Sequence, residues 1–441
     1  MSTASPPLAV PGFAAALHFW FKLGLVSFGG PAGQIALMHS ELVERRRWIS
    51  EARFLHALNY CMVLPGPEAQ QLATYLGWLM HRTRGGIAAG VLFVLPSLLL
   101  LIALSWLYVA LGSQPLVAGL FYGIKPAVVA LVVQAVHRIG GRALRSRVLW
   151  LIAGAALVAS WWLPFPLLIL AAALAGWAGG RWWPVSFGGG AALAKLKAPA
   201  QGALIDDDTP TPEHARYSRR RLLKVLVAGL LLWALPMAVL VLLSGWHGTL
   251  AQMGWFFTQA ALLSFGGAYA VLPFMFQGAV LHYGWLSTTQ MIDGLALGET
   301  TPGPLIMVVA FVGFVGAYQQ ALFGPELRWL AGAAAATVVS WFTFLPSFIF
   351  ILAGGPLVEA THGKLGFTAP LAGITAAVVA VIGKLALFFA GHVFWPAGAG
   401  VDALAVAIAI AALIALVRFR RGAIEVIAVC AVIGLVRGGM F

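Results

Sequence analysis

Nine apolar runs of 15 to 26 residues dominate the sequence and contain few charged residues. A helix needs about 20 such residues to cross the hydrocarbon core of a bilayer, which is about 30 Å thick. Only 9% of the residues are charged and the mean hydropathy is +0.92, whereas a soluble domain carries about 25% charged residues. The sequence therefore predicts an all-α polytopic membrane protein. The nine expected crossings are residues 86–111, 117–137, 148–163, 165–179, 222–244, 329–352, 367–389, 403–417 and 423–437.

One sequence pattern occurs twice, at an offset of 237 residues. SFGG is found at 27–30 and again at 264–267, and PGP is found at 65–67 and again at 302–304. A register kept over more than 100 positions indicates an internal duplication. Farther along the offset is 250, so that the second copy has 13 additional residues; the pairs that show this are Pro96-Ser97 with Pro346-Ser347 and Gly123-Ile124 with Gly373-Ile374.

The duplication divides the chain into four parts. Residues 1–180 form a first transmembrane repeat, and residues 245–441 form a second. Between them, residues 181–221 are polar and rich in Gly, Pro and Asp, which is typical of a linker. Residues 222–244 are a single apolar run, which we expect to be a connecting transmembrane helix.

Four further apolar segments are interrupted by the repeated motifs. Pro removes a backbone donor and clashes with the preceding helical turn, and Gly adopts non-helical dihedral angles easily. Each segment is either one broken crossing or a re-entrant helical hairpin. The segments are 12–43 and 251–281, broken at SFGG, and 54–80 and 291–319, broken at PGP.

The distribution of Lys and Arg favours hairpins and an inverted second repeat. Arg45 and Arg53 precede the segment 54–80 and Arg82 follows it, and short cytoplasmic loops are enriched in such residues. If all four segments are hairpins, the first repeat returns to a cytoplasmic linker and the helix 222–244 inverts the second repeat. This topology places 22 of the 27 Lys and Arg residues in the cytoplasm.

The breaks are where we expect a substrate to bind. Non-helical backbone at membrane depth must be satisfied by protein or water, and transporters built from inverted repeats bind substrates at discontinuous helices. A helix that restarts after a break directs free N–H groups toward the gap, which suits an anion. The alternative is that Gly and Pro only kink the helices or let them pack closely. The expected binding residues are Ser27, Gly29, Gly30, Pro65, Gly66, Pro67, Ser264, Gly266, Gly267, Pro302, Gly303 and Pro304.

Two carboxylates lie beside the breaks. Glu68 follows the first PGP, and Glu299 lies three residues before the second. Ionisable groups in transmembrane segments are costly and mark function by default, so we expect both to couple transport to protons. For Glu68 the alternative is a favourable position in the first turn of a restarting helix.

Other polar residues extend the candidate site. Lys22 and Lys125 could offset the charge of a bound dianion, or could extend their ammonium groups to the membrane interface. Asn59, Gln70, Gln71, Thr300 and Thr301 flank the breaks and could donate hydrogen bonds to an oxyanion. Such residues are as often helix-packing contacts.

No enzyme, metal-site or cofactor motif is present. The sequence has no HExxH, GxSxG or P-loop motif, and its ten His residues are scattered. The two cysteines, Cys61 and Cys430, lie in apolar stretches and do not form a disulfide framework. The net charge of +13 reflects membrane orientation rather than nucleic-acid binding. We therefore expect no catalytic residue, no metal and no cofactor. We expect the lipid bilayer, and not nucleic acid, to be the partner of this chain.

The doubled motifs resemble the chromate ion transporter family in its long, two-domain form. The matching segments are SFGGPAGQIALMHSELVERRRWIS at 27–50, LPGPEAQQLATYLGW at 64–78, SFGGAYAVLP at 264–273 and GETTPGPL at 298–305. Ala268 departs from the pattern, because a further Gly often follows SFGG in the second copy. The resemblance covers nearly the whole chain. It implies efflux of chromate across the bacterial inner membrane, with sulfate as the competing oxyanion.

Energetics agrees with efflux that needs no ATP. Moving one elementary charge through 100 mV is worth about 2.3 kcal/mol, so that a dianion leaving an inside-negative cell gains about 4.6 kcal/mol. Two alternatives stay open: transport of sulfate or another anion, and a scaffold or sensor that transports nothing. The sequence also leaves a homodimer open as the assembly.

Overall fold

The computed structural model describes residues 11–112, 114–187, 203–206, 209, 212–361, 368–396 and 400–438. Helices make up most of this part of the chain, and no strand occurs in it. Up to residue 187 the elements are α1 (Phe13–Val26), α2 (Gly30–His39), the π-helical turn η1 (Ser40–Arg45), α3 (Glu51–Val63), α4 (Glu68–Leu111), α5 (Pro115–Ala143), α6 (Arg147–Ala159), α7 (Phe165–Trp182) and α8 (Pro184–Phe187), the last of which lies within the predicted linker. In the described part of the linker a short turn, η3 (Glu213–Ala215), leads to α9 (Arg219–Ser244).

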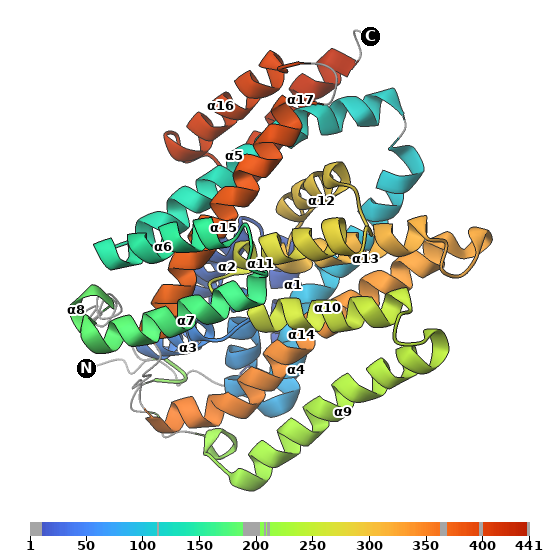
Figure 1. Cartoon of the computed structure of the whole chain (residues 1–441). Helices are drawn as coiled ribbons and strands as arrows, with labels where there is room; N and C mark the ends of the chain where they lie inside the picture. The colour runs from blue at the N-terminus through green and yellow to red at the C-terminus, as the bar shows by residue number, and fades with distance from the viewer. Residues whose placement is uncertain are drawn as a thin grey trace, which may run out of the picture.

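The rest of the chain repeats this series with small changes. Its elements are α10 (Thr249–Leu263), α11 (Ala268–Phe276), the π-helical turn η4 (Gln277–His282), α12 (Thr288–Thr300), η5 (Leu305–Met307), α13 (Val308–Gln319), η6 (Pro325–Leu327), α14 (Arg328–Thr361), α15 (Thr368–Phe394), α16 (Ala403–Val417) and α17 (Ala423–Gly438). In Figure 1 the short helices next to the breaks, α2, α11 and α12, lie near the centre of the view, with α9 at its lower edge.

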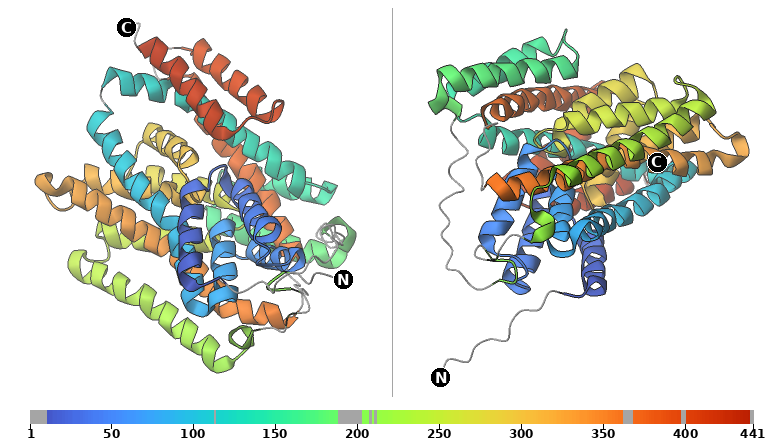
Figure 2. Two further views of the ribbon diagram at one scale, coloured as in Figure 1. Left: turned by 180° about the vertical axis from the view of Figure 1, so that it is seen from behind. Right: turned by 90° about the horizontal axis from the view of Figure 1, so that it is seen from below.

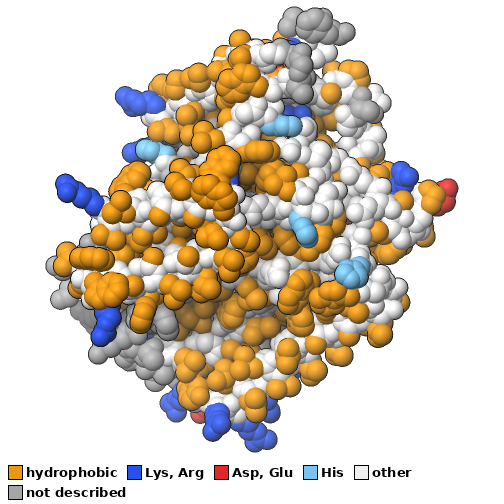
Figure 3. All heavy atoms as spheres, viewed as in Figure 1, with side chains coloured by type: hydrophobic (Ala, Val, Ile, Leu, Met, Phe, Trp, Pro, Cys, Tyr) orange, Lys and Arg blue, Asp and Glu red, His pale blue; other side chains and the backbone are white. Residues whose placement is uncertain are grey.

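The fold is that of a polytopic membrane protein. In the described part of the chain, six helical stretches are long and apolar enough to cross a bilayer: α4, α5, α7, α9, α15, and α14 together with η6. Each of the nine expected runs contains a helix in the described structure. Helices α6, α16 and α17 have only 13, 15 and 16 residues, fewer than the roughly 20 of a full crossing. Hydrophobic side chains cover most of the face in Figure 3, and Lys and Arg project mainly at its margins.

Helix α4 is folded back on itself. Its backbone leaves the helical region at His81 and Arg82, where Arg82 has φ 59°. In a straight helix residues 74 and 90 would be about 24 Å apart, yet a Cβ on Gly90 would touch the hydroxyl of Thr74. Residues 68–80 and 83–111 are therefore two antiparallel helices with a tight turn between them. The 13 additional residues of the second half fall here, because α13 and α14 are joined by the longer segment 320–327.

Local structure recurs at the sequence offset of 237. The N–H of Trp48 donates to the carbonyl of Leu42 at 2.8 Å, and the N–H of Trp285 donates to the carbonyl of Ala279 at 2.8 Å. Each π-helical turn is followed by a serine N-cap, Ser50 for α3 and Ser287 for α12. The W-x-S motif thus ends one helix and starts the next in both halves, since the serine oxygen accepts a free N–H of the first turn.

One long helix of each half packs against the other half. Helix α5 packs against α16 and α17, and its counterpart α15 packs against α6 and α7. Glycines allow the close approach: a Cβ on Gly123 would lie against Gly434, and one on Gly373 would lie 2.9 Å from the Cα of Gly176. Helix α9 takes no part in this packing and runs along the edge of the molecule (Figures 1 and 2), with only Gly229 and Met237 buried.

Candidate functional site at the helix breaks

The four breaks meet in two pairs. We call residues 27–30 with 302–304 the first junction, and residues 65–67 with 264–267 the second junction. At the first junction the N–H of Gly303 donates to the carbonyl of Ser27 at 2.8 Å; at the second the N–H of Gly66 donates to the carbonyl of Ser264 at 3.1 Å. These bonds are equivalent at the offset of 237. Each half of the chain therefore satisfies the broken backbone of the other, as membrane burial requires.

The junctions depend on glycine. Gly66 has φ 125° and Gly303 has φ 102°, which L side chains rarely adopt. A Cβ on Gly303 would lie 2.6 Å from the Cβ of Ser97, and one on Gly66 would overlap the hydroxyl of Ser347. The other break glycines at positive φ are Gly29 (88°), Gly30 (69°), Gly266 (83°) and Gly267 (96°). Of the break prolines, Pro67 and Pro304 immediately precede α4 and η5.

A buried glutamine supports each junction. Gln34 donates from Nε2 to the carbonyl oxygens of Gly303, at 2.5 Å, and Ser27, at 3.2 Å. Gln71 donates from Nε2 to the carbonyl of Pro65 at 2.7 Å and lies 3.3 Å from the Ser347 hydroxyl. The sequence analysis named Gln71 but not Gln34, although Gln34 is a polar residue in an apolar segment one turn after the break. Both amides fix backbone that would otherwise be free to move.

Two serines from long helices also reach the junctions. Ser97 of α4 lies against Gly303, and Ser347 of α14 lies against Gly66. Both side chains are buried, and within the described structure the Ser97 hydroxyl has no hydrogen-bond partner. The sequence marked both residues as repeat-equivalent without assigning them to the site. An unsatisfied hydroxyl here is a donor that a ligand could use.

Glu68 and Glu299 each lie close to the start of α11, at the second junction. A Cβ on Gly267 would lie 3.7 Å from Oε1 of Glu68, and Tyr269, in the first turn of α11, donates a hydrogen bond to Glu299. The guanidinium of Arg138 lies 5.9 Å from the centre of the Tyr269 ring, so that the tyrosine that donates to Glu299 also lies beside a positive charge. The predicted crossing 117–137 ends just before Arg138, whereas in the structure α5 extends to Ala143 and includes it.

Lys125 has a partner that the sequence analysis missed. Its ammonium lies 3.8 Å from Oδ1 of Asp293, and the Tyr108 hydroxyl donates to Oδ2 at 2.9 Å. Asp293 is a buried acid in the interrupted segment 291–319, and that alone could have identified it. Lys22, by contrast, has an exposed side chain on α1.

The remaining candidates are used locally. Gln70 donates to Thr74 at 3.0 Å, Thr301 donates to the carbonyl of Gly298 at 3.2 Å, and Asn59 is exposed. Thr300 likewise donates to carbonyls of its own helix. In this conformation these donors therefore do not point into either junction.

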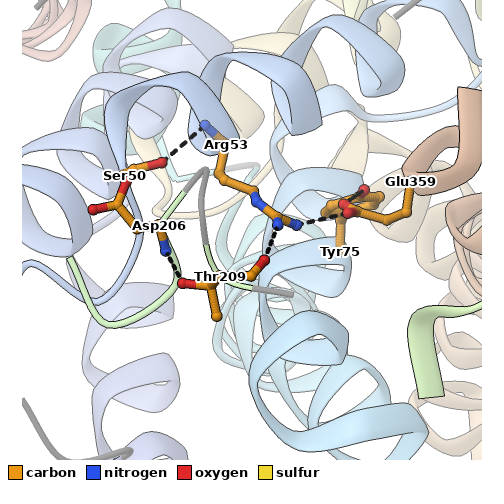
Figure 4. A network of polar contacts seen from close by, with 6 residues as sticks. All are labelled: Ser50, Arg53, Tyr75, Asp206, Thr209 and Glu359. Atoms are coloured by element: carbon orange, nitrogen blue, oxygen red, sulfur yellow. Dashed lines mark hydrogen bonds and ion pairs between the residues drawn. The ribbon is translucent and has the colours of Figure 1, made fainter. Parts of the chain in front are cut away.

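A polar network fastens the linker near the end of α14 (Figure 4). Arg53 pairs with Glu359 at 2.7 Å and donates to the carbonyl of Thr209 at 2.9 Å. Tyr75 donates to the other oxygen of Glu359 at 2.5 Å. This cluster joins α3 to the end of α14, and the cluster of Asp293 and Tyr108 joins α12 to the end of α4. The two polar clusters thus occupy corresponding places in the two halves.

No group of three or more His, Cys, Asp or Glu side chains in the described structure could hold a metal ion. The chemistry of the junctions is therefore that of backbone N–H groups, hydroxyls, amides, one arginine and two carboxylates. Such a set can bind an anion and exchange protons.

Comparison with known proteins identifies the family. A family model described as "Chromate transporter" matches residues 14–177 and 251–435. The chain belongs to the chromate transporter family. Its two matched segments contain all four breaks. The chain is accordingly a membrane transporter and not an enzyme.

Three relatives are named for the same ion. The chain is 36% identical to the chromate transport protein of Pseudomonas aeruginosa over 386 residues, which cover 86% of this chain and 80% of the relative. It is 30% identical to the chromate transport protein of Cupriavidus metallidurans, covering 82% and 79% of the two chains. It is 29% identical to the probable chromate transport protein of Synechococcus elongatus, covering 84% of each. No solved structure matches the chain.

Proposed function

We propose that this transporter exports chromate from the bacterial cytoplasm across the inner membrane. The family and its three named relatives support chromate as the substrate. The observation that carries the location of the site is the reciprocal pair of hydrogen bonds, Gly303 to Ser27 and Gly66 to Ser264, which brings the broken helices of both halves together. Broken helices that meet across a repeat interface are where transporters of this design bind substrates.

The membrane potential is the proposed driving force. A dianion that leaves an inside-negative cell gains about 4.6 kcal/mol at 100 mV, and each proton that moves with it reduces this gain by about 2.3 kcal/mol. Glu68 and Glu299 are the proposed coupling residues, because both lie at the second junction beside Arg138. The proposal includes an inverted second repeat, for which the Lys and Arg distribution is the support.

Transport in everted vesicles tests this function. Export from cells becomes uptake in such vesicles, so labelled chromate should accumulate inside them, and an interior-positive potential should increase the accumulation. Vesicles from cells that lack the protein are the control, and Gly29 and Gly66 variants should reduce uptake. An inserted, folded protein that accumulates no chromate under any potential would exclude the proposal.

Competition with sulfate tests the alternative substrate. Both ions are tetrahedral dianions, so excess unlabelled sulfate should reduce chromate uptake if the site reads shape and charge alone. If labelled sulfate is accumulated and chromate is not, the transported ion is sulfate and the chromate assignment is wrong.

A further inference from the structure

Arg138 is a cation near the second junction for which no close carboxylate is found in the described structure. Within the described part of the chain, no carboxylate oxygen lies within 4.0 Å of its guanidinium, which is 5.9 Å from the centre of the Tyr269 ring. Two other cations, by contrast, are paired with carboxylates: Arg53 with Glu359 at 2.7 Å and Lys125 with Asp293 at 3.8 Å. Arg138 thus forms a close ion pair with neither Glu68 nor Glu299.

The surroundings of Arg138 include residues of several other helices. Glu68 begins α4, Tyr269 lies in the first turn of α11, and Glu299 lies near the end of α12. The remaining charged or titratable groups that act on these residues are Arg142, one turn along α5, and the buried Cys61 of α3. Arg138, Glu68 and Glu299 are all partly exposed, whereas Gly66 and Ser264 between them are buried. The charged groups are therefore more exposed than the backbone junction itself.

The balance of charge makes anion binding depend on protons. With both carboxylates ionised, Arg138 and Arg142 are already neutralised, and a dianion would add two uncompensated negative charges in a medium of low dielectric constant. A proton on one carboxylate removes part of this repulsion and leaves the arginine free for the ligand. The planar guanidinium suits the paired oxygens of a tetrahedral oxyanion better than an ammonium does.

We propose that Arg138 binds the transported oxyanion when one of the two carboxylates, Glu68 or Glu299, is protonated. One dianion and one proton therefore bind together. This inference rests on the proposed function. It makes Arg138 the principal ligand at the second junction, with the proton shared by the two glutamates. Export of one dianion with one proton carries one net negative charge outward, so that the potential still drives it.

Binding to the purified protein in detergent tests this site. Chromate affinity would be measured by equilibrium dialysis over the alkaline range in which chromate itself stays a dianion. Because one proton binds with the ion, the wild-type dissociation constant should rise about tenfold for each pH unit in which the glutamates are ionised. Replacing Arg138 by Gln should weaken binding by about 10- to 100-fold, and Arg138→Lys should weaken it less, since the charge remains.

The glutamate variants distinguish proton coupling from simple structural damage. A Glu68→Gln, Glu299→Gln double variant imitates the protonated state, and should bind chromate with an affinity that no longer depends on pH. The matched control is Arg147→Gln, an exposed arginine at the start of α6, which should behave as wild type.

The two proposals fail in different ways. If the wild-type protein binds no chromate, the proposed function is wrong. If it binds chromate, and Arg138→Gln elutes as a folded protein with unchanged affinity, Arg138 is not the ligand. If the affinity of the wild type does not change with pH, no proton binds with the ion and the coupling is refuted.

Discussion

At the scale of single residues, Gly66 and Gly303 are the junction positions where we expect a substitution to be tolerated least. Replacing Gly303 by Ala combines a backbone angle that costs about 1 to 3 kcal/mol with a methyl group 2.6 Å from the Ser97 Cβ. We expect Gly303→Ala and Gly66→Ala each to reduce chromate uptake in vesicles to a small fraction of wild type and to lower the thermal unfolding midpoint. Gly141→Ala in α5 is the control, because nothing lies within 4 Å of its added Cβ. Full uptake by both junction variants would contradict a requirement for glycine.

The buried ion pair of Arg53 and Glu359 permits a second residue-scale prediction. The two side chains are only 12% and 5% exposed, so Glu359→Ala leaves Arg53 and Tyr75 without their shared acceptor. Removing one partner of a buried pair costs about 3 to 5 kcal/mol, and we expect a corresponding loss of stability in denaturant unfolding. Glu425→Ala breaks the exposed pair with Arg421 and should change little. Equal stability of the Glu359 and Glu425 variants would show that the network is not structural.

The sequence alone could predict the residues that belong to a repeated motif or lie next to one. Gly66, Gly303, Glu68 and Glu299 belong to the repeated motifs or adjoin them, and a comparison of the chain with itself finds them. Arg138 and Asp293 carry no repeated pattern. Their roles depend on which helix lies opposite, and one sequence does not state that.

At the scale of helices, the sequence predicts lengths and breaks but not partners. The nine apolar runs and the four interruptions were all found from hydropathy, Gly and Pro. The packing of α5 against α16 and α17 joins segments about 300 residues apart, and no local periodicity reports such a contact. The turn at His81 and Arg82 lies between the predicted segment 54–80 and the predicted run 86–111, where Arg82 and Arg84 interrupt the apolar sequence.

The contact of α5 with α17 predicts an intolerant glycine. A Cβ on Gly123 would overlap the backbone carbonyl of Cys430 and lie 2.9 Å from the N of Gly434. Backbone cannot move aside as a side chain can, so Gly123→Ala must separate the two helices. We expect a large fall in the yield of monodisperse protein in size-exclusion chromatography. Gly154→Ala, where nothing lies within 4 Å, should give the wild-type yield; a normal profile for Gly123→Ala would show that the two helices do not need this close contact.

At the scale of the whole molecule, the two halves have equivalent turns whose sides of the membrane can be compared. The turn at His81 and Arg82 corresponds to the segment 320–327, since both follow the helix that starts after PGP. If each repeat begins and ends on one side, the single helix α9 between them places the second repeat on the opposite side. Parallel repeats would instead place both turns on the same side.

Thiol labelling decides between these arrangements. Cys61 and Cys430 are both buried, and their replacement by Ala gives a background for single cysteines at two exposed positions, Arg84 and Glu326. We expect a membrane-impermeant maleimide to label Arg84→Cys only in everted vesicles and Glu326→Cys only in intact cells. The reason is electrostatic, because Arg82 and Arg84 flank the first turn whereas Glu326 and Arg328 flank the second. If both positions are labelled from the same side, the two repeats have the same orientation. Inverted topology is then excluded as the basis of transport, although the reciprocal junctions would still stand.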